Sequence, residues 1–331
     1  MTDKSIFMKF LYVLCVFFLA GCSSEREPSK LDAWMQEKDK VRVLSTTAMV
    51  GDLVANIGRE HVAGQTLILG EIDPHSYELV KGDDEKISFA QIVFYSGLGL
   101  EHGASLRYSL LHHSNAVALG DCIQKEHPEL ILTDDGQIDP HVWMDISLWA
   151  KAVGPIVAAL SRTDPAHAAE YQLNGEKFLQ EMLSAHQDIR EKMLQIPVEK
   201  RFLVTSHDAF NYFTRAYLAD ASEREQADWN KRFEAPEGLA PDGQLSAADI
   251  QRIINHICLY HVTVVFPESN VSRDSLRKII SACKEKGINA TISSQALYGD
   301  AMGGLDSDAN GYIKMIQHDA NVLQNAWQDE K

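Results

Sequence analysis

The fold is indicated by the stretch from Pro165 to Leu194, which reads PAHAAEYQLNGEKFLQEMLSAHQDIREKML. Its apolar residues recur at helical spacing, and thirty helical residues would extend over about 45 Å, the diameter of a domain or more. Asp164 followed by Pro165 is a typical helix start, and Pro197 is a typical stop. We therefore predict one long helix that joins two lobes.

Short β-branched runs lie on both sides of this segment and alternate with helical patterns. They read as continuous apolar runs, which is typical of parallel strands covered on both faces. The sequence predicts an α/β fold with mostly parallel sheets; a single α/β domain carrying one long surface helix is the alternative. The predicted strands are 41–45, 66–69 and 91–95 before the helix, and 202–205, 262–266 and 288–292 after it.

The amino terminus has the features of an export signal. Lys4 and Lys9 precede an apolar run of about ten residues, too short to cross a bilayer as a permanent helix. The run ends in Leu-Ala-Gly before Cys22, which resembles the lipobox of bacterial lipoproteins. That resemblance implies cleavage before Cys22 and a lipid on its thiol. An ordinary cleaved signal with an incidental cysteine is the alternative.

These features predict five segments along the chain. The polar residues after the signal suit a flexible tether, and residues 221–243, charged and containing two prolines, suit a long surface excursion. The segments are a signal peptide at 1–21, a lipid-proximal tether at 22–40, an N-terminal lobe at 41–163, a linking helix at 164–196 and a C-terminal lobe at 197–331.

Composition favours a soluble globular body and argues against nucleic acid as a partner. Hydrophobic residues make up 45% and charged residues 24% of the chain. There are 47 acidic and 31 basic side chains, for a net charge of −16, and such a surface repels phosphate backbones.

Three cysteines follow Cys22, namely Cys122, Cys258 and Cys283, so at most one disulfide can form among them. Cys258 and Cys283 lie in the apolar stripes of two predicted helices, and a bridge between them is possible. Two inert core thiols are the favoured interpretation. The absence of a Cys-x-x-Cys motif argues against thiol redox chemistry and against a cysteine-based zinc site.

Four residues are candidates for a metal site. His75 and His141 each end an Asp-Pro-His tripeptide, in which proline stiffens the loop that presents the ring. His207 ends the strongest strand of the second half, and Asp300 lies in a loop after the last strand. Ligands of open α/β sheets bind beyond the carboxyl ends of strands, so these four side chains could converge in the cleft between lobes.

The chemistry of this set suits a transition metal. Three neutral imidazoles and one carboxylate are donors that zinc, iron or manganese accept, whereas magnesium and calcium prefer oxygen ligands. The chain has 13 histidines, and most must be ordinary surface or core residues. The repeated tripeptide strengthens the expectation that His75 and His141 are metal ligands. Glu268 could orient a ligand ring or be a salt-bridged loop carboxylate, and Asp73 and Asp139 are expected to cap their own turns.

These motifs resemble those of the zinc, manganese and iron solute-binding lipoproteins of bacterial ABC importers, cluster A-I. The resemblance covers essentially the whole mature chain, and residues 235–241 with Gly99-Leu-Glu-His102 further resemble the chlamydial iron-binding branch. It rests on the lipobox, Asp-Pro-His-Ser-Tyr-Glu78, Ile92 to Glu101, Asp139-Pro-His-Val-Trp-Met-Asp145, Ser206-His-Asp208-Ala-Phe and Tyr298-Gly-Asp300.

The resemblance implies two α/β lobes bridged by a rigid helix, with a metal between them. It implies that His75, His141, His207 and Asp300 are the ligands of one iron, manganese or zinc ion. It also implies an extracytoplasmic protein in the periplasm or at the cell surface, anchored by lipid on Cys22, that delivers the metal to an ABC permease with its ATPase. We expect it to act as a monomer.

The sequence departs from the family pattern in ways that bear on the metal. Leu79 and Ile146 stand where prolines are common, both outside the expected ligand set. The histidines that zinc members concentrate in one loop are scattered here at 112, 113 and 127, which favours iron or manganese. Many manganese members have glutamate where this chain has His207, which argues against manganese. Four ligands alone do not name the ion.

The sequence is compatible with three functions, of which metal capture is favoured. A metallohydrolase would need an open coordination position and a nearby base, and Glu268 is the only base that the sequence offers. A surface adhesin with a structural metal would have residues 221–243 as its contact surface. We expect the protein not to be an enzyme.

Overall fold

The computed structural model describes residues 30–134, 136–241 and 246–328. The predicted signal peptide and the lipidation site Cys22 lie outside these residues. Contacts divide the chain into two units, Met1–Gln36 and Glu37–Lys331. In the first unit, the short helix α2 spans Lys30–Met35. The polar composition did not predict this helix, which is built from the good helix formers Lys, Leu, Ala and Met.

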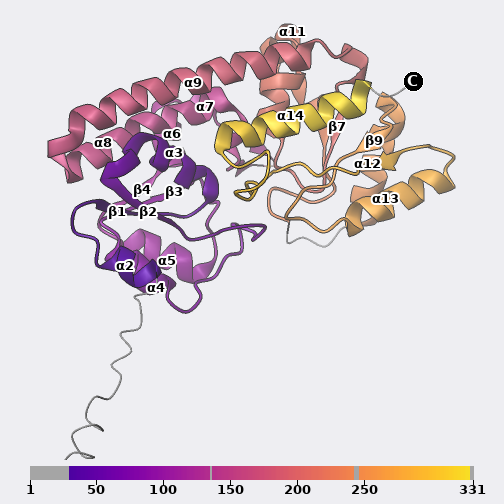
Figure 1. The fold of residues 1–331 in the computed structure, drawn as a ribbon. Helices are drawn as coiled ribbons and strands as arrows, with labels where there is room; N and C mark the ends of the chain where they lie inside the picture. The colour runs from indigo at the N-terminus through magenta and orange to yellow at the C-terminus, as the bar shows by residue number, and fades with distance from the viewer. Residues whose placement is uncertain (1–29, 135, 242–245, 329–331) are drawn as a thin grey trace, which may run out of the picture. The chain divides into compact units, whose positions relative to one another are not determined.

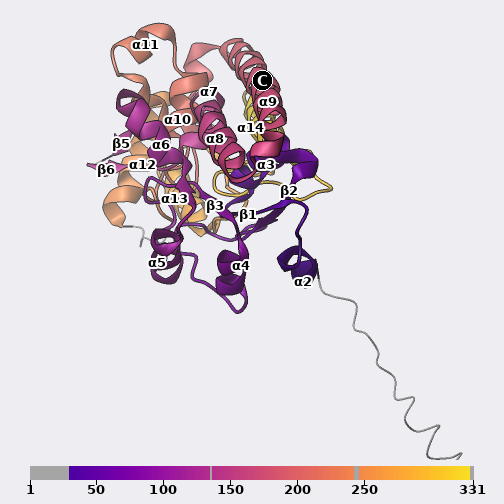
Figure 2. The same ribbon diagram turned by 90° about the vertical axis from the view of Figure 1, so that its left-hand side faces the viewer.

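The first half of the second unit is built on a four-stranded parallel sheet in the order β2-β1-β3-β4. Helix α3 lies on one face of this sheet, and α4 and α5 lie on the other (Figures 1 and 2). The elements are β1 Val41–Ser45, α3 Ala48–Gly58, η1 Arg59–His61, β2 Val62–Thr66, α4 Asp83–Phe89, β3 Ile92–Tyr95, α5 Ala104–His112, β4 Ala116–Ala118 and α6 Leu119–Glu126.

Two of the three strands predicted here, 41–45 and 91–95, agree with β1 and β3. The strand predicted at 66–69 is wrong, because β2 ends at Thr66 and pairs with β1 from Val62. The apolar pattern missed it since Gly64 interrupts the run and β2 is a half-buried edge strand. The three-residue strand β4 was not predicted, because it is too short to show a period.

Helix α9, Ala168–Leu194, confirms the predicted long helix and is preceded by the 3-10 turn η5, Pro165–His167. It packs against α8 and α3 of the first half and against α14 and η7 of the second, and Figure 1 shows it running along both. Its buried face consists mainly of Tyr171, Gly175, Phe178, Met182, Ala185, Ile189 and Met193. Before it come η2 Pro128–Leu130, β5 Thr133–Asp134, β6 Gln137–Ile138, η3 Val142–Met144, α7 Ile146–Trp149, η4 Ala150–Ala152 and α8 Val153–Thr163.

The second half also has parallel strands, but each is only two residues long. β7 pairs with β8 and β9 with β10, and a bond from the Phe266 N–H to the Val204 carbonyl joins the two pairs. The elements are η6 Val198–Lys200, β7 Leu203–Val204, α10 Asn211–Phe213, η7 Thr214–Leu218, α11 Ala221–Glu225, η8 Trp229–Arg232, β8 Phe233–Glu234, α12 Ala247–Tyr260, β9 Val264–Val265, α13 Asp274–Glu285, β10 Thr291–Ile292 and α14 Tyr312–Gln328.

The buried apolar side chains form two clusters. The larger runs without a break from the first sheet through α9 to α14. The smaller lies between α12, α13 and β9, where Ile253, Val265 and Leu276 are fully buried. The α/β class, the parallel sheets and the long helix are therefore confirmed. The domain boundaries at 41–163, 164–196 and 197–331 stay a prediction.

The expectation that residues 221–243 form a surface excursion is wrong for residues 232–236, whereas most of 221–231 is exposed or half-buried. β8 joins the second group of strands, and Phe233 and Ala235 are buried. Arg232 is buried too, with its Nε 2.6 Å from an Oε2 of Glu223. High charge suggested exposure, but here opposite charges pair with each other inside the fold.

The three described cysteines are free thiols. Cys283 is buried as expected, but Cys258 is exposed, so the interpretation of two core thiols holds for only one of them. Among the described residues, no helix combines the length and the apolar character that a membrane crossing needs.

Candidate metal centre

The two Asp-Pro-His motifs build matching turns. The Asp73 carboxylate accepts from the His75 backbone N–H at 2.8 Å, and the Asp139 carboxylate accepts from that of His141 at 2.9 Å. The predicted turn-capping role of both aspartates is thus confirmed. Asp139 has a second role, because the same oxygen lies 2.8 Å from Nδ1 of the His141 ring.

His207 follows β7, and its position depends on Glu268, which follows β9. One Glu268 oxygen accepts from the backbone N–H groups of Ser206 and His207, at 3.0 and 2.8 Å. The other lies 2.6 Å from Nδ1 of the His207 ring. Of the two interpretations that the sequence left open for Glu268, the structure supports the orientation of a ring.

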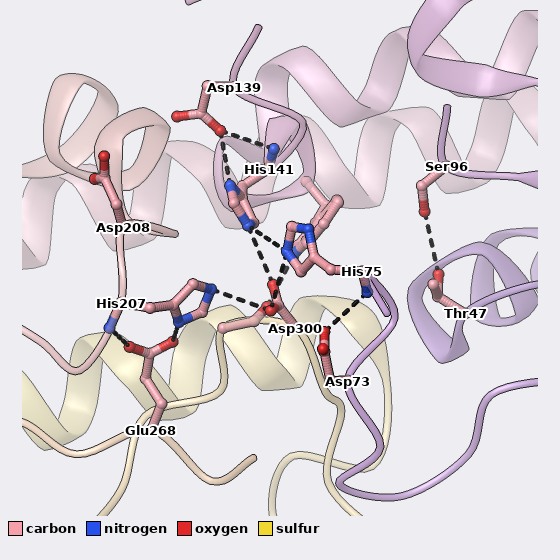
Figure 3. Close-up of polar contacts among 12 residues, drawn as sticks. Thr47, Asp73, His75, Ser96, Asp139, His141, His207, Asp208, Glu268 and Asp300 are labelled. Atoms are coloured by element: carbon pink, nitrogen blue, oxygen red, sulfur yellow. Dashed lines mark hydrogen bonds and ion pairs between the residues drawn. The ribbon is translucent and has the colours of Figure 1, made fainter. Parts of the chain in front are cut away.

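The four predicted ligands meet at one point (Figure 3). Asp300 is central to the group: its carboxylate oxygens lie 3.4 Å from Nε2 of His75, 3.3 Å from Nε2 of His141 and 3.1 Å from Nε2 of His207. The Nε2 atoms of His75 and His141 are 3.2 Å apart. All four residues are buried, with at most 4% of any one exposed.

Burial and neighbouring charges shift the pKa values of all four residues in this cluster. Burial opposes a charged ring at His141, but Asp139 and Asp300 outweigh it and raise the pKa to about 9. Burial likewise opposes a charged His207, and Glu268 and Asp300 raise its pKa well above the usual value. The pKa of His75 is lowered by burial. Burial disfavours ionised Asp300, yet His207 and His75 hold its pKa well below normal.

The donor atoms fit a single transition-metal ion. Both Asp300 oxygens and both ring nitrogens of His207 are buried without a well-aligned hydrogen bond, and of these only Nδ1 of His207 has a partner closer than 3 Å, the Glu268 carboxylate at 2.6 Å. Metal–ligand distances of ~2.1 Å place neighbouring donors about 3.0–3.4 Å apart in octahedral or tetrahedral geometry, and the spacings above fall close to this range. Since carboxylates pair with Nδ1 of His141 and His207, their Nε2 atoms are left to face the shared point.

The loop that carries Asp300 is fixed from two sides. The indole N–H of Trp143 donates to the Gly299 carbonyl at 2.9 Å, and the Tyr298 N–H donates to buried Asp319 at 2.9 Å. A Cβ at Gly299 would lie 2.4 Å from a Glu268 carboxylate oxygen, so only glycine leaves room for the contact between Glu268 and His207.

Trp143 and Asp319 are supporting residues that no sequence motif predicted. A carboxylate inside the apolar stripe of α14 was the available signal for Asp319. The scattered His112, His113 and His127 are not part of the cluster. The stretch Gly97-Leu-Gly-Leu-Glu101 forms a turn ahead of α5, closed by the buried Glu101 carboxylate, which accepts from the N–H groups of Ser96 and Gly97.

Fold and site together define a class: α/β proteins with a long connecting helix and a buried site of three imidazoles and one carboxylate. Residues 43–326 match the family described as zinc-uptake complex component A, periplasmic. The chain belongs to this family of metal solute-binding proteins, which are substrate-binding components of ABC transporters and not enzymes. The predicted resemblance and the expected lack of enzymatic activity are both confirmed.

Individual relatives cover nearly the whole chain. The metal-binding protein YtgA of Chlamydia muridarum is 37% identical over 314 residues, 94% of this chain and 92% of its own. The manganese-binding lipoprotein MntA of Bacillus subtilis is 31% identical over 316 residues, 95% of this chain and 96% of its own.

Solved structures agree with the fold. Fe(III)-bound YtgA from Chlamydia trachomatis superposes with a TM-score of 0.82 at 36% identity, covering 87% of this chain and 98% of that one. The periplasmic zinc-binding protein TroA from Treponema pallidum gives a TM-score of 0.78 at 28% identity, covering 87% of this chain and 99% of that one.

Proposed function

We propose that this protein captures one transition-metal ion with His75, His141, His207 and Asp300 and delivers it to a membrane permease. The observation that carries the proposal is the convergence of three ring nitrogens and one carboxylate within a buried cluster, all within 4.8 Å of one another. A fully buried, charged cluster of this kind is costly unless an ion compensates it. A closed set of four protein donors suits binding and release better than catalysis.

We propose iron or manganese as the favoured cargo, with zinc as the alternative. Support comes from the Fe(III)-bound relative and from the manganese-binding relative. A relative at 28% identity is named as zinc-binding, and three imidazoles with one carboxylate also suit zinc, so the donor set alone does not name the ion. The choice of cargo therefore rests on competition between ions.

The cellular setting is part of the same proposal. Relatives are named as lipoproteins, which supports lipid on Cys22 as the anchor at the periplasmic or outer surface of a membrane. The partners are an ABC permease and its ATPase, and the protein acts as a monomer. Replacing Cys22 with alanine should shift the chain from the membrane fraction to the soluble fraction and remove the lipid mass.

Hydrolysis is not favoured by the geometry. Glu268 was the only base that the sequence offered, and both of its oxygens are engaged, one by two backbone N–H groups and the other by the His207 ring. A general base needs a free oxygen within reach of a bound water.

The test is a competition experiment on the full chain in a mild detergent. After chelation, the protein is offered equal concentrations of Fe²⁺, Mn²⁺ and Zn²⁺ under anaerobic conditions, and the bound metal is measured by elemental analysis. We expect one ion per chain in the buried site, mainly iron or manganese. The variant His141→Ala should lose this ion, and full retention would contradict the ligand assignment. A predominance of zinc would contradict the proposed cargo alone.

A further inference from the structure

A second group of metal-binding side chains lies at the start of the long helix. It consists of His61 from η1, His167 from η5 and Glu170 from the first turn of α9, and one donor atom from each lies within 4.8 Å of the others. Nε2 of His61 is 2.7 Å from an Oε2 of Glu170. This cluster shares no residue with the capture site.

One histidine of this group is oriented in the same way as a ligand of the capture site. Nδ1 of His167 lies 2.7 Å from the Asp164 carboxylate, as Nδ1 of His141 lies 2.8 Å from Asp139. The Tyr171 hydroxyl donates to the same Asp164 oxygen at 2.7 Å and holds it in place. Because Nδ1 is engaged, Nε2 is the atom that His167 has left for a metal, the arrangement that carboxylates impose on metal-binding histidines.

The two rings already lie together and remain open to water. The ring centroids of His61 and His167 are 3.9 Å apart at an angle of 17°. The side chains of His61, His167 and Glu170 are 18%, 37% and 55% exposed. Each ring needs to turn toward a shared ion, and their partial exposure allows this without opening the core.

We propose that His61, His167 and Glu170 bind a second divalent cation of the zinc, nickel or copper type at the protein surface. Two imidazoles and one carboxylate are the donors that such ions prefer. Three protein ligands leave a coordination position for water, so this site is more open than the capture site. Asp164 is a positioning residue that fixes the tautomer of His167. The bound ion joins η1 to the first turn of α9.

Metal titration of the full chain in detergent tests the proposal, with Zn²⁺ as the probe. Equilibrium dialysis of metal-free protein should show two ions per chain, one bound more weakly. His61→Ala and His167→Ala should each abolish the weaker ion and leave the tighter one. Asp164→Asn should weaken only the second ion, by about 10- to 100-fold, the range for outer carboxylates of metal-binding histidines. His112→Ala, which removes an exposed histidine elsewhere on the surface, is the matched control and should change neither.

Two further measurements keep the outcome clear. Circular dichroism of each metal-free variant reports folding, and the partly exposed Glu170→Gln provides a substitution that leaves both rings in place. In Asp300→Ala the weaker ion should persist, which separates this site from the capture site. A single bound ion across the whole titration, or a second ion that survives in the His61→Ala, His167→Ala double variant, would overturn the proposal.

Discussion

Each half of the molecule supplies two of the proposed metal ligands, and the contacts that hold His75 and His207 differ. In the C-terminal half, Glu268 contacts both the ring and the backbone of His207, and Asp319, together with Trp143 from the N-terminal half, fixes the loop of Asp300. In the N-terminal half, His75 has a backbone bond to Asp73, and no carboxylate pairs with its Nδ1 among the described contacts. In the N-terminal half Asp139 holds the ring of His141 much as Glu268 holds that of His207, so His75 is the proposed ligand with the most freedom to adjust.

The strands differ in the opposite direction, because the more regular sheet is in the N-terminal half. The N-terminal sheet has four parallel strands of three to five residues, whereas each C-terminal strand has two. The C-terminal half compensates with side-chain bonds beyond its strand ends, such as those of Glu268. Precise placement of a ligand thus comes from polar contacts next to the site, and a long regular sheet is not required.

Removal of a ligand should have the largest effect and should separate the two halves. His75→Ala and His207→Ala should each weaken metal binding by more than about 100-fold, beyond the usual cost of losing an outer residue. His207→Ala should also reduce the free energy of unfolding of the metal-free protein by about 3 kcal/mol, because it leaves the buried Glu268 carboxylate unpaired. Isothermal titration and urea unfolding measure the two effects. Equal losses of apo stability in both variants would remove the distinction between His75 and His207.

Lowering the pH should reduce the stability of the C-terminal half by protonation of His256. This ring is buried with Nε2 unpartnered, and burial, with Arg252 nearby, lowers its pKa to about 4. The unfolded chain, with a histidine pKa of about 6.5, binds the proton more readily. Stability should therefore fall as the pH drops from about 6.5 to 4, by on the order of 3 kcal/mol.

Urea midpoints at pH 7 and pH 4.5 measure this loss. His256→Gln, which cannot titrate, should show a smaller decrease between the two pH values than the parent chain. The same decrease in both proteins would show that other groups cause it.

Loss of the carboxylate behind His207 should have a smaller effect than loss of the ring itself. Glu268→Gln keeps the size of the side chain but removes its charge, and should weaken metal binding by about 10- to 100-fold. Asp73→Asn, the matched change behind His75, should have less effect, because Asp73 contacts the His75 backbone and not its ring. If Asp73→Asn proved the more harmful in a competition assay with a metal chelator, His75 would not be the less constrained ligand.

The smallest effect on metal affinity is expected for the hydrogen bond between Trp143 and Gly299, which joins the two halves. Trp143→Phe keeps an aromatic ring but loses the N–H that donates to the Gly299 carbonyl. One such bond contributes about 1 kcal/mol, which corresponds to about a five-fold weaker metal affinity. Stopped-flow release of metal to a chelator should show faster dissociation. An unchanged release rate would indicate that Asp319 alone fixes the Asp300 loop.

Much of this architecture is accessible without coordinates. The periodicity of residues 165–194 predicted α9, and the apolar runs at 41–45 and 91–95 predicted two strands, because burial imposes a repeat that a sequence displays. The four members of the cluster were named in advance from repeated tripeptides and from strand ends. Strand β2 was misplaced, because an edge strand is defined by its partner more than by its own residues.

Local patterns also could not reveal the supporting contacts. Asp319 lies 21 residues from Tyr298, and Trp143 lies 156 residues from Gly299. Residues 221–243 look like a surface segment because they are charged, and only the fold shows that Arg232 and Glu223 neutralise each other inside.

The amino-acid order by itself determined the α/β class, the long helix and the kinds of donor atoms available, since these depend on the spacing of neighbours and on side-chain chemistry. The tertiary structure alone decided that donor atoms of His75, His141, His207 and Asp300 lie within 4.8 Å of one another and that Glu268 contacts the His207 ring. Those facts depend on distances between residues far apart in the chain, which are fixed only when the shared core has packed.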